Sequence, residues 1–294
     1  MTEYPPNRPL ISFTLFAYNQ ERYISEAVAG AFSQNYEPME LILSDDCSTD
    51  RTFEIMQEMA KTYKGPHEVR LRRNEINLGV AGHVNAVFAV ARGDILLLAA
   101  GDDVSLPNRT KVSVDLLNNN TEASAVLLSA HVIDESGKKI GQRLVGHRDG
   151  NKKSQSLQDL IKLRYVTFGA TRAIRSEVFK QFGPLNNECP TEDTPLLLRS
   201  LIYGKNIISQ RKLILYRKHQ ENLSSTASLS RMNTTAIYTQ YRHDIAFSEK
   251  SFLISGTVAK KLRKWLDLDQ RMRQIRLQIA LRRRVKLLDA VFLS

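Results

Sequence analysis

Two pairs of neighbouring carboxylates lie in the first third of the sequence, Asp45-Asp46 and Asp102-Asp103. Each pair directly follows a run of apolar residues that predicts a buried strand. Like charges this close together raise each other's pKa unless a cation or hydrogen-bond donors compensate for them. In open α/β sheets, ligands bind at the edge where the strands have their carboxyl ends. The two pairs therefore predict a site for a metal ion and a phosphorylated ligand.

Strand and helix patterns alternate through the part of the chain that carries these pairs. This alternation predicts a mostly parallel central sheet with right-handed crossovers and flanking helices. Such an architecture binds nucleotides in many proteins, but the architecture alone does not specify a function. The predicted strands cover 10–16, 39–43, 69–71 and 95–99, and the helices between them cover 21–32, 51–63 and 80–91.

The later part of the chain has a less regular pattern. Helices are predicted over 108–117, 176–182 and 191–203, and strands over 124–133, 138–145 and 207–216, the last as edge strands. Polar composition predicts a loop over 146–156 and an irregular segment over 164–174. From residue 230 the pattern is helical. We therefore expect three regions: 1–105 and 106–225, which form two halves of one domain, and a helical extension over 226–294.

Composition excludes several classes of protein. The 294 residues are 42% hydrophobic, which is normal for a globular protein. The two cysteines, Cys47 and Cys189, form no disulfide framework and predict free thiols in a reducing cytosol. No apolar run is long enough for a membrane-spanning helix, and the first residues lack a signal-peptide core. We therefore expect a cytoplasmic protein.

The net charge of +11 is concentrated near the C-terminus. Residues 260–286 hold 11 Lys and Arg residues against two Asp residues, so this stretch carries +9. Apolar residues recur at helical spacing among the cations, and the pattern over 257–294 predicts a basic amphipathic helix suited to an anionic membrane surface. Alternatively, the apolar stripe packs on the rest of the chain or on a second copy, giving a homo-oligomer. A charge this local does not indicate binding to nucleic acid.

Five short motifs, taken together and in order, resemble those of family 2 glycosyltransferases with the GT-A fold. The resemblance covers roughly residues 8–225 and implies a GT-A-like α/β fold with the helical extension behind it. Four of the motifs coincide with loops after predicted strands or with a helix start. The motifs are Phe16-Ala17-Tyr18-Asn19, Asp45-Asp46-Cys47-Ser48-Thr49-Asp50, Gly101-Asp102-Asp103, Glu192-Asp193, and Tyr216-Arg217-Lys218-His219 with Asn222 and Ser224.

The resemblance implies a nucleotide site in the first half. Asp46 would accept the N3–H of uracil or thymine, since a carboxylate there forms a charge-assisted hydrogen bond and excludes cytosine. Asp45 is expected to hold its loop, and Asp50 is expected to cap the next helix. The remaining donor contacts implied by the resemblance come from Phe16, Ala17, Tyr18, Asn19, Asn77, Gly79, Asp102 and Arg217.

The resemblance also implies a metal site and a general base. Asp103 and His219 would hold Mn²⁺ or Mg²⁺, which bridges the donor phosphates and stabilises the leaving diphosphate. Asp193 would remove the acceptor's proton, with Glu192 orienting the acceptor. By themselves, two acids in a first helical turn only favour the helix dipole, and an isolated surface histidine is seldom a ligand.

The sequence departs from the family pattern at three positions. Ala100 and Pro195 stand where many members have another acid, and His83 replaces a basic residue that often borders the donor. These departures put in doubt the strength of metal binding, some acceptor contacts and the donor contact of residue 83. Ala100 and Pro195 are also the only hints of a rival interpretation, a membrane- or polyanion-binding module whose active site has decayed.

The sequence thus predicts a metal-dependent inverting glycosyltransferase. It would move a sugar from a UDP- or dTDP-sugar to a hydroxyl of a glycan or lipid-linked acceptor, in cell-surface polysaccharide synthesis, as a peripheral protein on the cytoplasmic face of the membrane. A sugar-nucleotidyltransferase would need a Gly-rich phosphate loop with a basic residue after the first strand, but the chain has Ala17-Tyr18-Asn19-Gln20 there. A dinucleotide-dependent oxidoreductase is disfavoured because no Gly-x-Gly-x-x-Gly follows a strand.

Overall fold

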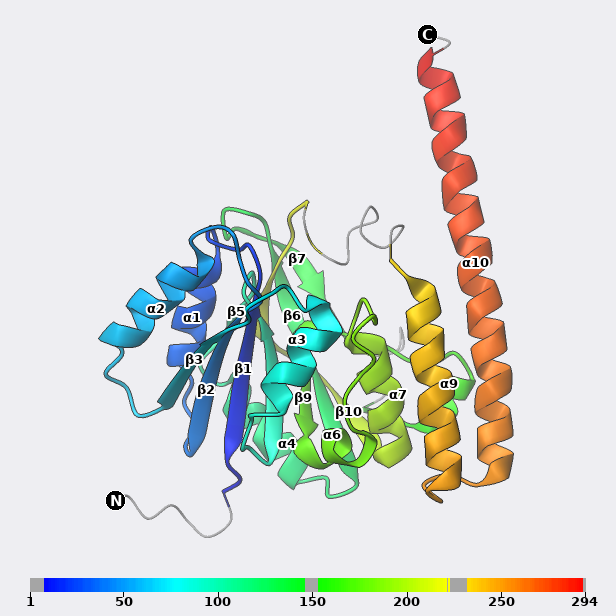
Figure 1. Ribbon diagram of the computed structural model, residues 1–294, viewed down its shortest axis with the longest axis horizontal. Helices are drawn as coiled ribbons and strands as arrows, with labels where there is room; N and C mark the ends of the chain where they lie inside the picture. The colour runs from blue at the N-terminus through cyan, green and yellow to red at the C-terminus, as the bar shows by residue number, and fades with distance from the viewer. Residues whose placement is uncertain (1–7, 146–152, 221, 223–231, 293–294) are drawn as a thin grey trace.

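The computed structural model describes residues 8–145, 153–220, 222 and 232–292, and within this part the side chains of 274 and 276–292 are not described. The described strands form one ten-stranded sheet in the order β3-β2-β1-β4-β9-β6-β10-β5, with β7 on β6 and β8 on β10. Helices cover both faces of this sheet (Figure 1). The predicted α/β class with a mostly parallel central sheet is confirmed.

The first half of the chain forms the parallel part of the sheet. β1 lies between β2 and β4, and β3 follows β2, all in parallel register. β2 is buried along its whole length, with the apolar run Leu41-Ile42-Leu43 at its centre, and its polar residues Glu40, Ser44 and Asp45 are hydrogen-bonded within the protein. The elements are β1 (Ile11–Ala17), α1 (Ile24–Phe32), β2 (Met39–Asp45), α2 (Thr52–Thr62), β3 (Glu68–Arg73), α3 (Gly79–Phe88) and β4 (Ile95–Ala100).

The second half extends the same sheet with mixed strand directions. It contains β5 (Val104–Ser105), α4 (Arg109–Asn118), β6 (Ala123–Ile133), β7 (Lys139–Arg143), β8 (Ser154–Gln155), α5 (Leu157–Ile161), the 3₁₀ turn η1 (Gly169–Thr171), β9 (Ala173–Arg175), α6 (Ser176–Phe182), α7 (Asp193–Tyr203) and β10 (Lys205–Arg217). β6 and β10 are parallel, and β9 is antiparallel to both β4 and β6. The two halves therefore share one sheet.

Two sequence-based expectations for this half were wrong. The segment 164–174 was expected to be irregular, but it contains η1 and the start of β9, which lies in the middle of the sheet. The segment 207–216 was expected to form edge strands, but β10 is one strand between β6 and β5. β9 has only three residues, too few for a periodic pattern, and register shifts along β10 interrupt its alternation.

Two apolar cores lie on opposite faces of the sheet. One contains side chains of α1, α2 and α4, and the other contains side chains of α3, α6 and α7. The helices α9 (Thr234–Lys250) and α10 (Gly256–Phe292) form a hairpin that joins the second core. On the right of Figure 1, α9 lies beside α7 and α10 lies on the outer side of α9, and the later part of α10 extends past the sheet.

The first turns of α10 are part of the protein interior. Ala259, Leu262, Trp265 and Leu266 are all buried, in the core that also holds α7 and α9. Of the two alternatives for the apolar stripe, packing on the rest of the chain therefore holds for this segment. The expected boundary near residue 225, and the side chains of the stripe beyond Ile275, lie outside the described residues.

We expect Trp265→Ala to lower the free energy of unfolding by about 3–5 kcal/mol, because it empties a buried aromatic site. Trp265 is 3% exposed, and its ring packs edge-on against Tyr241 at 5.4 Å between centroids. The matched control is Leu268→Ala on the same helix, where the side chain is 47% exposed and the expected loss is about 0.5 kcal/mol or less. Urea denaturation measures both, and equal losses would contradict the assignment of α10 to the core.

Candidate functional site

The strand register brings the two acidic pairs to one edge of the sheet. Ala17 lies beside Asp45 across β1 and β2, and Phe16 lies beside Ala100 across β1 and β4. Backbone bonds continue this pairing past the strand ends, because the Asp46 amide donates to the Ala17 carbonyl over 2.9 Å. The loops after β1, β2 and β4 therefore meet at the carboxyl edge of the parallel strands.

Asp46 is buried and has one carboxylate oxygen engaged. Its Oδ1 accepts hydrogen bonds from Asn74 Nδ2 at 2.6 Å and from the Leu78 amide at 2.9 Å. Its Oδ2 has no hydrogen-bond partner among the residues that the structure describes. The carboxylate thus holds the loop before α3 with one oxygen and leaves the other for a ligand.

Two expected donor contacts lie in this loop before α3. Asn77 turns its side chain to the helix start, where its Oδ1 accepts from the Gly79 amide at 2.9 Å. Gly79 has φ of +69°, in the left-handed region that a glycine adopts without strain. The backbone of this loop therefore lies beside Asp46, and the Asn77 side chain bonds the first residue of α3.

The four residues 16–19, which lie at the end of β1 and directly after it, have different roles. The Phe16 ring packs edge-on against His83 in the core, and Ala17 is buried. Asn19 joins two loops, because its Oδ1 accepts from the Thr49 amide at 2.9 Å. Tyr18 and Asn19 are both exposed, and Tyr18, with 46% of its surface exposed, has the one ring of this motif that is not packed in the core. Tyr18 is therefore the side chain of this motif that is free to lie on a base.

Asp45 and Asp50 hold the loop between β2 and α2. Asp45 Oδ2 accepts from the Ser48 amide at 2.9 Å and lies 3.3 Å from the guanidinium of Arg73. Asp50 Oδ1 accepts from the Thr52 amide at 3.0 Å, at the start of α2, and its Oδ2 accepts from the Glu21 amide at 3.0 Å. Both carboxylates have loop and capping partners, the kind of role the sequence predicted for them.

A buried polar chain behind Asp46 was missed by the sequence analysis. Burial lowers the pKa of His83 to about 4, so its ring is neutral at pH 7, and its Nε2 shares a hydrogen bond with the Ser44 hydroxyl at 2.6 Å. Arg72 of β3 donates to the same hydroxyl at 2.8 Å and to Asn74 Oδ1 at 2.7 Å. Arg72, and not residue 83, supplies the positive charge beside the Asp46 loop.

Asp102 and His219 lie in contact although they are far apart in the sequence. His219 Nε2 is 2.9 Å from Asp102 Oδ2, and Asn222 Nδ2 donates to the same oxygen at 3.3 Å. Asn222 Oδ1 in turn accepts from the His219 amide at 2.7 Å, which fixes the turn after β10. Ser224, the last residue of this motif, lies outside the described residues.

Asp103 lies deeper than Asp102. Its Oδ1 accepts from the Arg217 amide at 2.8 Å, while its Oδ2 is buried and has no hydrogen-bond partner among the described residues. Burial and the Asp102 carboxylate raise the pKa of Asp103 well above its usual value. Burial also lowers the pKa of the nearby Arg109 to about 9. The structure therefore pairs His219 with Asp102 and places Asp103 beneath them.

Arg217 is a structural residue in this structure, contrary to the expected contact with the donor. Its side chain is fully buried, and its donors are directed to the protein. Nε donates to the Asp102 carbonyl at 3.0 Å, and a terminal nitrogen donates to Glu26 Oε2 at 2.9 Å. The guanidinium also lies 4.8 Å above the Tyr23 ring. Arg217 thus holds the Asp102 loop from below.

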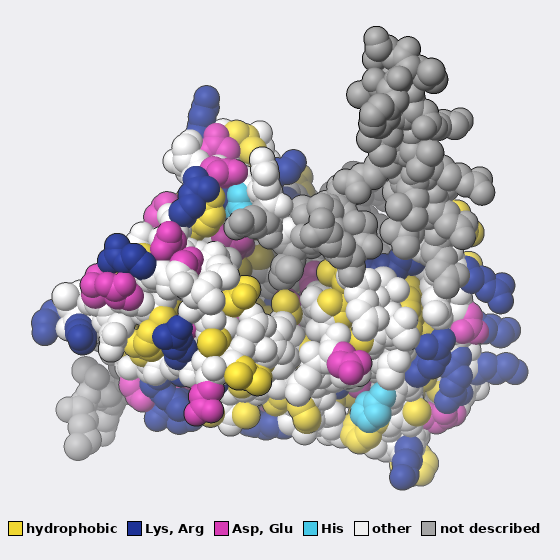
Figure 2. Space-filling model, turned by 45° about the horizontal axis from the view of Figure 1, so that its top comes forward, with side chains coloured by type: hydrophobic (Ala, Val, Ile, Leu, Met, Phe, Trp, Pro, Cys, Tyr) yellow, Lys and Arg dark blue, Asp and Glu magenta, His cyan; other side chains and the backbone are white. Residues whose placement is uncertain are grey.

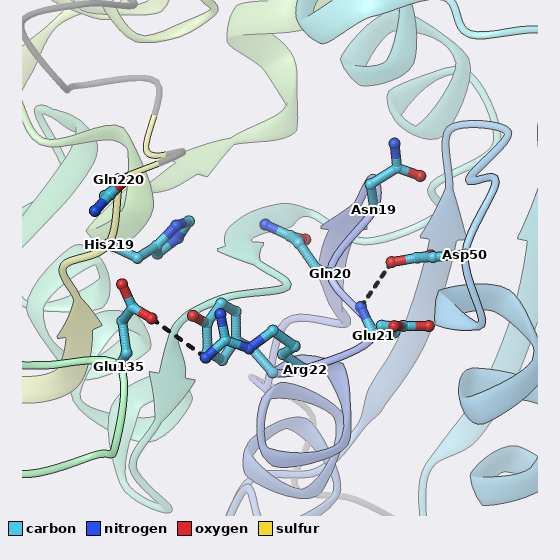
Figure 3. Close-up of a pocket in the computed structure, with 9 residues that line it drawn as sticks. Asn19, Gln20, Glu21, Arg22, Asp50, Glu135, His219 and Gln220 are labelled. Atoms are coloured by element: carbon cyan, nitrogen blue, oxygen red, sulfur yellow. Dashed lines mark hydrogen bonds and ion pairs between the residues drawn. The ribbon is translucent and has the colours of Figure 1, made fainter.

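A hollow of about 400 Å³ opens beside His219. Figure 3 shows His219 and Gln220 on one side of it and Gln20 on the other. An exposed ion pair between Arg22 and Glu135, 3.2 Å long, lies at its rim. The hollow is lined by polar side chains from the loop after β1, the β6–β7 turn and the end of β10.

The Glu192-Asp193 pair lies at the start of α7, and hydrogen bonds from neighbouring residues fix one oxygen of the Asp193 carboxylate. Asp193 Oδ1 accepts from the fully buried Arg172 at 2.8 Å and from the Thr167 hydroxyl. Burial and the adjacent Asp193 raise the pKa of Glu192 to about 7. A Cβ on Gly169 would stand 2.5 Å from Glu192 Oε1, so a side chain at this position would displace the Glu192 carboxylate.

The antiparallel strand β9 brings this pair to the same edge as the other carboxylates. Leu97 of β4 lies beside Ala173 of β9, so the residues just before β9 lie near the end of β4. Arg109, the neighbour of Asp103, donates to the Ala170 carbonyl at 2.9 Å, next to Gly169. Within the described part of the chain no three His, Cys, Asp or Glu residues form a ready metal site.

Comparisons with known proteins agree with this arrangement. The family described as "Glycosyl transferase family 2" matches residues 12–183. The chain is 34% identical over 129 residues to a putative glycosyltransferase, EpsE, of Bacillus subtilis, covering 44% of this chain and 46% of that protein. It is 29% identical over 229 residues to an uncharacterized protein of Mycobacterium tuberculosis, covering 75% and 62%. The chain thus spans about half to three-fifths of the length of these relatives.

Solved structures match over most of the fold. S. aureus TarS in complex with UDP-GlcNAc superposes with a TM-score of 0.65 at 17% identity, over 87% of this chain and 71% of that one. A mannosyltransferase of Pyrobaculum calidifontis in complex with GDP-Man and Mn²⁺ superposes with a TM-score of 0.59 at 15% identity, over 96% and 76%. At these identities the likeness concerns the fold.

The family match and the fold point the same way as the motifs. The matched segment, 12–183, is more than half of the chain and carries the loops of Asp46, Asp102 and Asp103. The predicted resemblance is therefore confirmed, and the protein belongs to glycosyltransferase family 2.

Proposed function

We propose that this protein is a metal-dependent inverting glycosyltransferase that moves a sugar from a UDP- or dTDP-sugar to an acceptor hydroxyl. One observation carries the proposal. Carboxylates from three separate parts of the chain, Asp46, Asp102 and Asp193, gather at the carboxyl edge of one sheet. Residues 1–105 would supply the donor site and 106–225 the acceptor site.

The nucleotide would lie between Tyr18 and the Asp46 loop. Asp46 Oδ2 is available to accept the N3–H of a uracil or thymine ring. Tyr18 is exposed enough to stack on that ring, and Arg72 lies on the other side of the same loop. The complexes of TarS with UDP-GlcNAc and of the mannosyltransferase with GDP-Man support a nucleotide-sugar donor for this chain.

Asp102 and His219 are the residues that would hold a divalent cation. The donor set fits, because a carboxylate and an imidazole already face each other and diphosphate oxygens can complete the coordination. The unpartnered, buried Oδ2 of Asp103 adds negative charge that a cation nearby would offset. A cation bound there supplies electrostatic stabilisation of the leaving diphosphate. This proposal exchanges the sequence-based roles of Asp102 and Asp103.

Asp193 would act as the general base toward the acceptor. Arg172 and Thr167 fix its Oδ1, which leaves Oδ2 for the acceptor hydroxyl. That oxygen would take the hydroxyl proton as the acceptor oxygen attacks the anomeric carbon, opposite the departing diphosphate. Glu192, beside it, would bind and orient the acceptor, and its second negative charge favours proton removal.

The rival functions have less support in the structure. A nucleotidyltransferase needs a loop that wraps the phosphates after β1, but Asn19 in that loop is bonded to the Thr49 amide. A buried polar atom without a hydrogen-bond partner destabilises the fold, so a protein that no longer needs its site would be expected to lose such atoms. Asp103 keeps a buried Oδ2 with no partner among the described residues. Purified protein with Mn²⁺ and a panel of nucleotide sugars distinguishes these functions, because release of UDP or dTDP requires a transferase-type site.

The acceptor is proposed to be a glycan or lipid-linked molecule of cell-surface polysaccharide synthesis, met at a membrane. None of the described helices is both long and apolar enough to cross a bilayer. The outward face of α10 instead combines exposed cations with Leu268 and Ile275, which are 47% and 55% exposed. Phe252, in the α9–α10 turn, is 94% exposed. The cations of this face are Lys260, Lys261, Lys264 and Arg271.

Charge favours a lipid surface over a second copy of the chain. Lys and Arg side chains gather at the right of Figure 2, over α9 and α10. Two such faces would repel each other, whereas an anionic bilayer attracts the cations and accepts the exposed apolar side chains. We therefore propose peripheral binding to an anionic membrane through this face of α10.

Asp102→Asn is expected to raise the Mn²⁺ concentration for half-maximal UDP release about tenfold or more, because it removes a charged oxygen ligand. Asp103→Asn is the comparison, and it should move this midpoint much less since Asp103 lies beneath the site. Titration of both variants with Mn²⁺ measures the effect. The reverse result would restore the assignment of Asp103 to the cation.

The rate at saturating donor should rise with pH and reach half its maximum near pH 7, where Glu192 loses its proton. The pKa of Glu192 is raised, so below pH 7 the carboxyl is neutral and cannot assist Asp193. Glu192→Gln should remove this inflection, whereas Glu188→Gln, at an exposed position of the same segment, should keep it. A pH profile that keeps its inflection in Glu192→Gln would exclude this role.

Reversing three cations of α10 should weaken binding to vesicles that contain anionic lipid by about a hundredfold or more, since each Lys near such a surface contributes about 1 kcal/mol. The variant is Lys260→Glu, Lys261→Glu and Lys264→Glu together. Cosedimentation with phosphatidylglycerol-containing vesicles measures it.

The matched control reverses the same charge elsewhere, with Lys61→Glu, Lys64→Glu and Lys180→Glu, all at exposed positions. It tests whether net charge alone drives binding. Equal losses in both variants would contradict a specific membrane face on α10.

A further inference from the structure

A fully buried ion pair joins the helix that carries Asp193 to the C-terminal extension. Arg199 of α7 and Asp244 of α9 are each 0% exposed. The guanidinium bonds both carboxylate oxygens, with Nε donating to Oδ2 at 2.8 Å and a terminal nitrogen donating to Oδ1 at 3.0 Å. This fork-to-fork geometry fixes the orientation of Arg199.

The remaining donors of Arg199 hold the chain that leads into α7. One terminal nitrogen donates to the Gly183 carbonyl at 2.7 Å, and the other donates to the Pro184 carbonyl at 3.2 Å. Gly183 has φ of +72°, so the chain turns sharply at this point after α6. The guanidinium thus fastens the first residues of the segment 183–192, which ends at the Glu192-Asp193 pair.

A second side chain of α9 holds the same segment. The Asn186 amide donates to Gln240 Oε1 at 2.5 Å, and Gln240 Nε2 donates to Asp244 Oδ1 at 2.8 Å. Asp244 therefore orients both Arg199 and Gln240. From α3, Asn85 also accepts from the Leu185 amide at 2.7 Å. A single carboxylate of the extension thus sets two of the groups that fix the approach to the proposed base.

We propose that Asp244 is a positioning residue for the Glu192-Asp193 pair, so that the C-terminal extension is part of the machinery for the transfer step. The inference rests on the proposed function of that pair. It concerns the acceptor side alone, since no hydrogen bond or ion pair joins the Asp46 and Asp102 loops to α9 among the described residues. Loss of Asp244 should therefore affect turnover and leave donor binding intact.

The ion pair need not be there for stability. Buried ion pairs are often replaced by apolar residues of similar volume at little cost, whereas removal of one partner leaves a buried charge and is strongly destabilising. A double variant, Arg199→Met with Asp244→Leu, therefore removes the Arg199 hydrogen bonds to Gly183 and Pro184, and the bond that orients Gln240, while preserving packing. It separates the positioning role from folding.

The test compares this double variant with Glu40→Gln, which weakens another buried carboxylate network. Glu40 is 1% exposed and bonds Arg70 and Arg92 at the far end of β2 from the site. We expect the double variant to lower kcat for UDP release from the UDP-sugar that the wild-type protein turns over with Mn²⁺ by about tenfold to a hundredfold, because small misplacements of reacting groups have effects of this size. KM for that donor should stay unchanged, and Glu40→Gln should keep kcat.

Hydrogen exchange of the backbone amides gives a readout that does not depend on activity. In the double variant the amides of 185–192 should exchange about tenfold faster, while those of β1 and β4 keep their protection. Unchanged exchange in 185–192, or a kcat equal to that of Glu40→Gln, would overturn the inference. If the wild-type protein releases neither UDP nor dTDP from any nucleotide sugar, the proposed function fails, and the exchange result still decides whether the Arg199–Asp244 pair positions the segment.

Discussion

The compensation of negative charge at the carboxyl edge of the sheet is the constraint on which the site depends. Asp102 and Asp103 are adjacent, and burial together with the Asp102 carboxylate raises the pKa of Asp103. The Arg217 amide bonds Asp103, while its guanidinium bonds the Asp102 carbonyl from below. Because Arg217 ends β10, the second half of the chain must be folded before the acidic loop of the first half has its support.

The way in which the protein compensates each negative charge explains the different roles of the acidic residues. Carboxylates whose oxygens are engaged by the protein, such as Asp45 and Asp50, hold loops in place. Asp46 and Asp193 each bond the protein through one oxygen, so their orientation is fixed, and the other oxygen has no hydrogen-bond partner among the described residues. Fixed orientation with one available oxygen is the arrangement that a preorganised site requires.

The helical extension belongs to the domain both through its core and through its polar contacts. Trp265 and Leu266 of α10 pack in the core that also holds α7, and Asp244 of α9 bonds Arg199 of α7. The apolar stripe of α10 and the cations on its opposite face therefore have different roles. The stripe builds the interior, and the cations remain on the outside.

The sequence by itself determined the class of fold, the strands β1, β2, β4 and β6, and the family, because these depend on local periodicity and on short motifs. It could not place β9, which is three residues long and stable only between β4 and β6. It also grouped His219 with Asp103, whereas His219 contacts Asp102, and it did not find Arg72, Arg172 or Asp244. These assignments depend on burial and on contacts between residues far apart in the chain, and only the tertiary structure creates both.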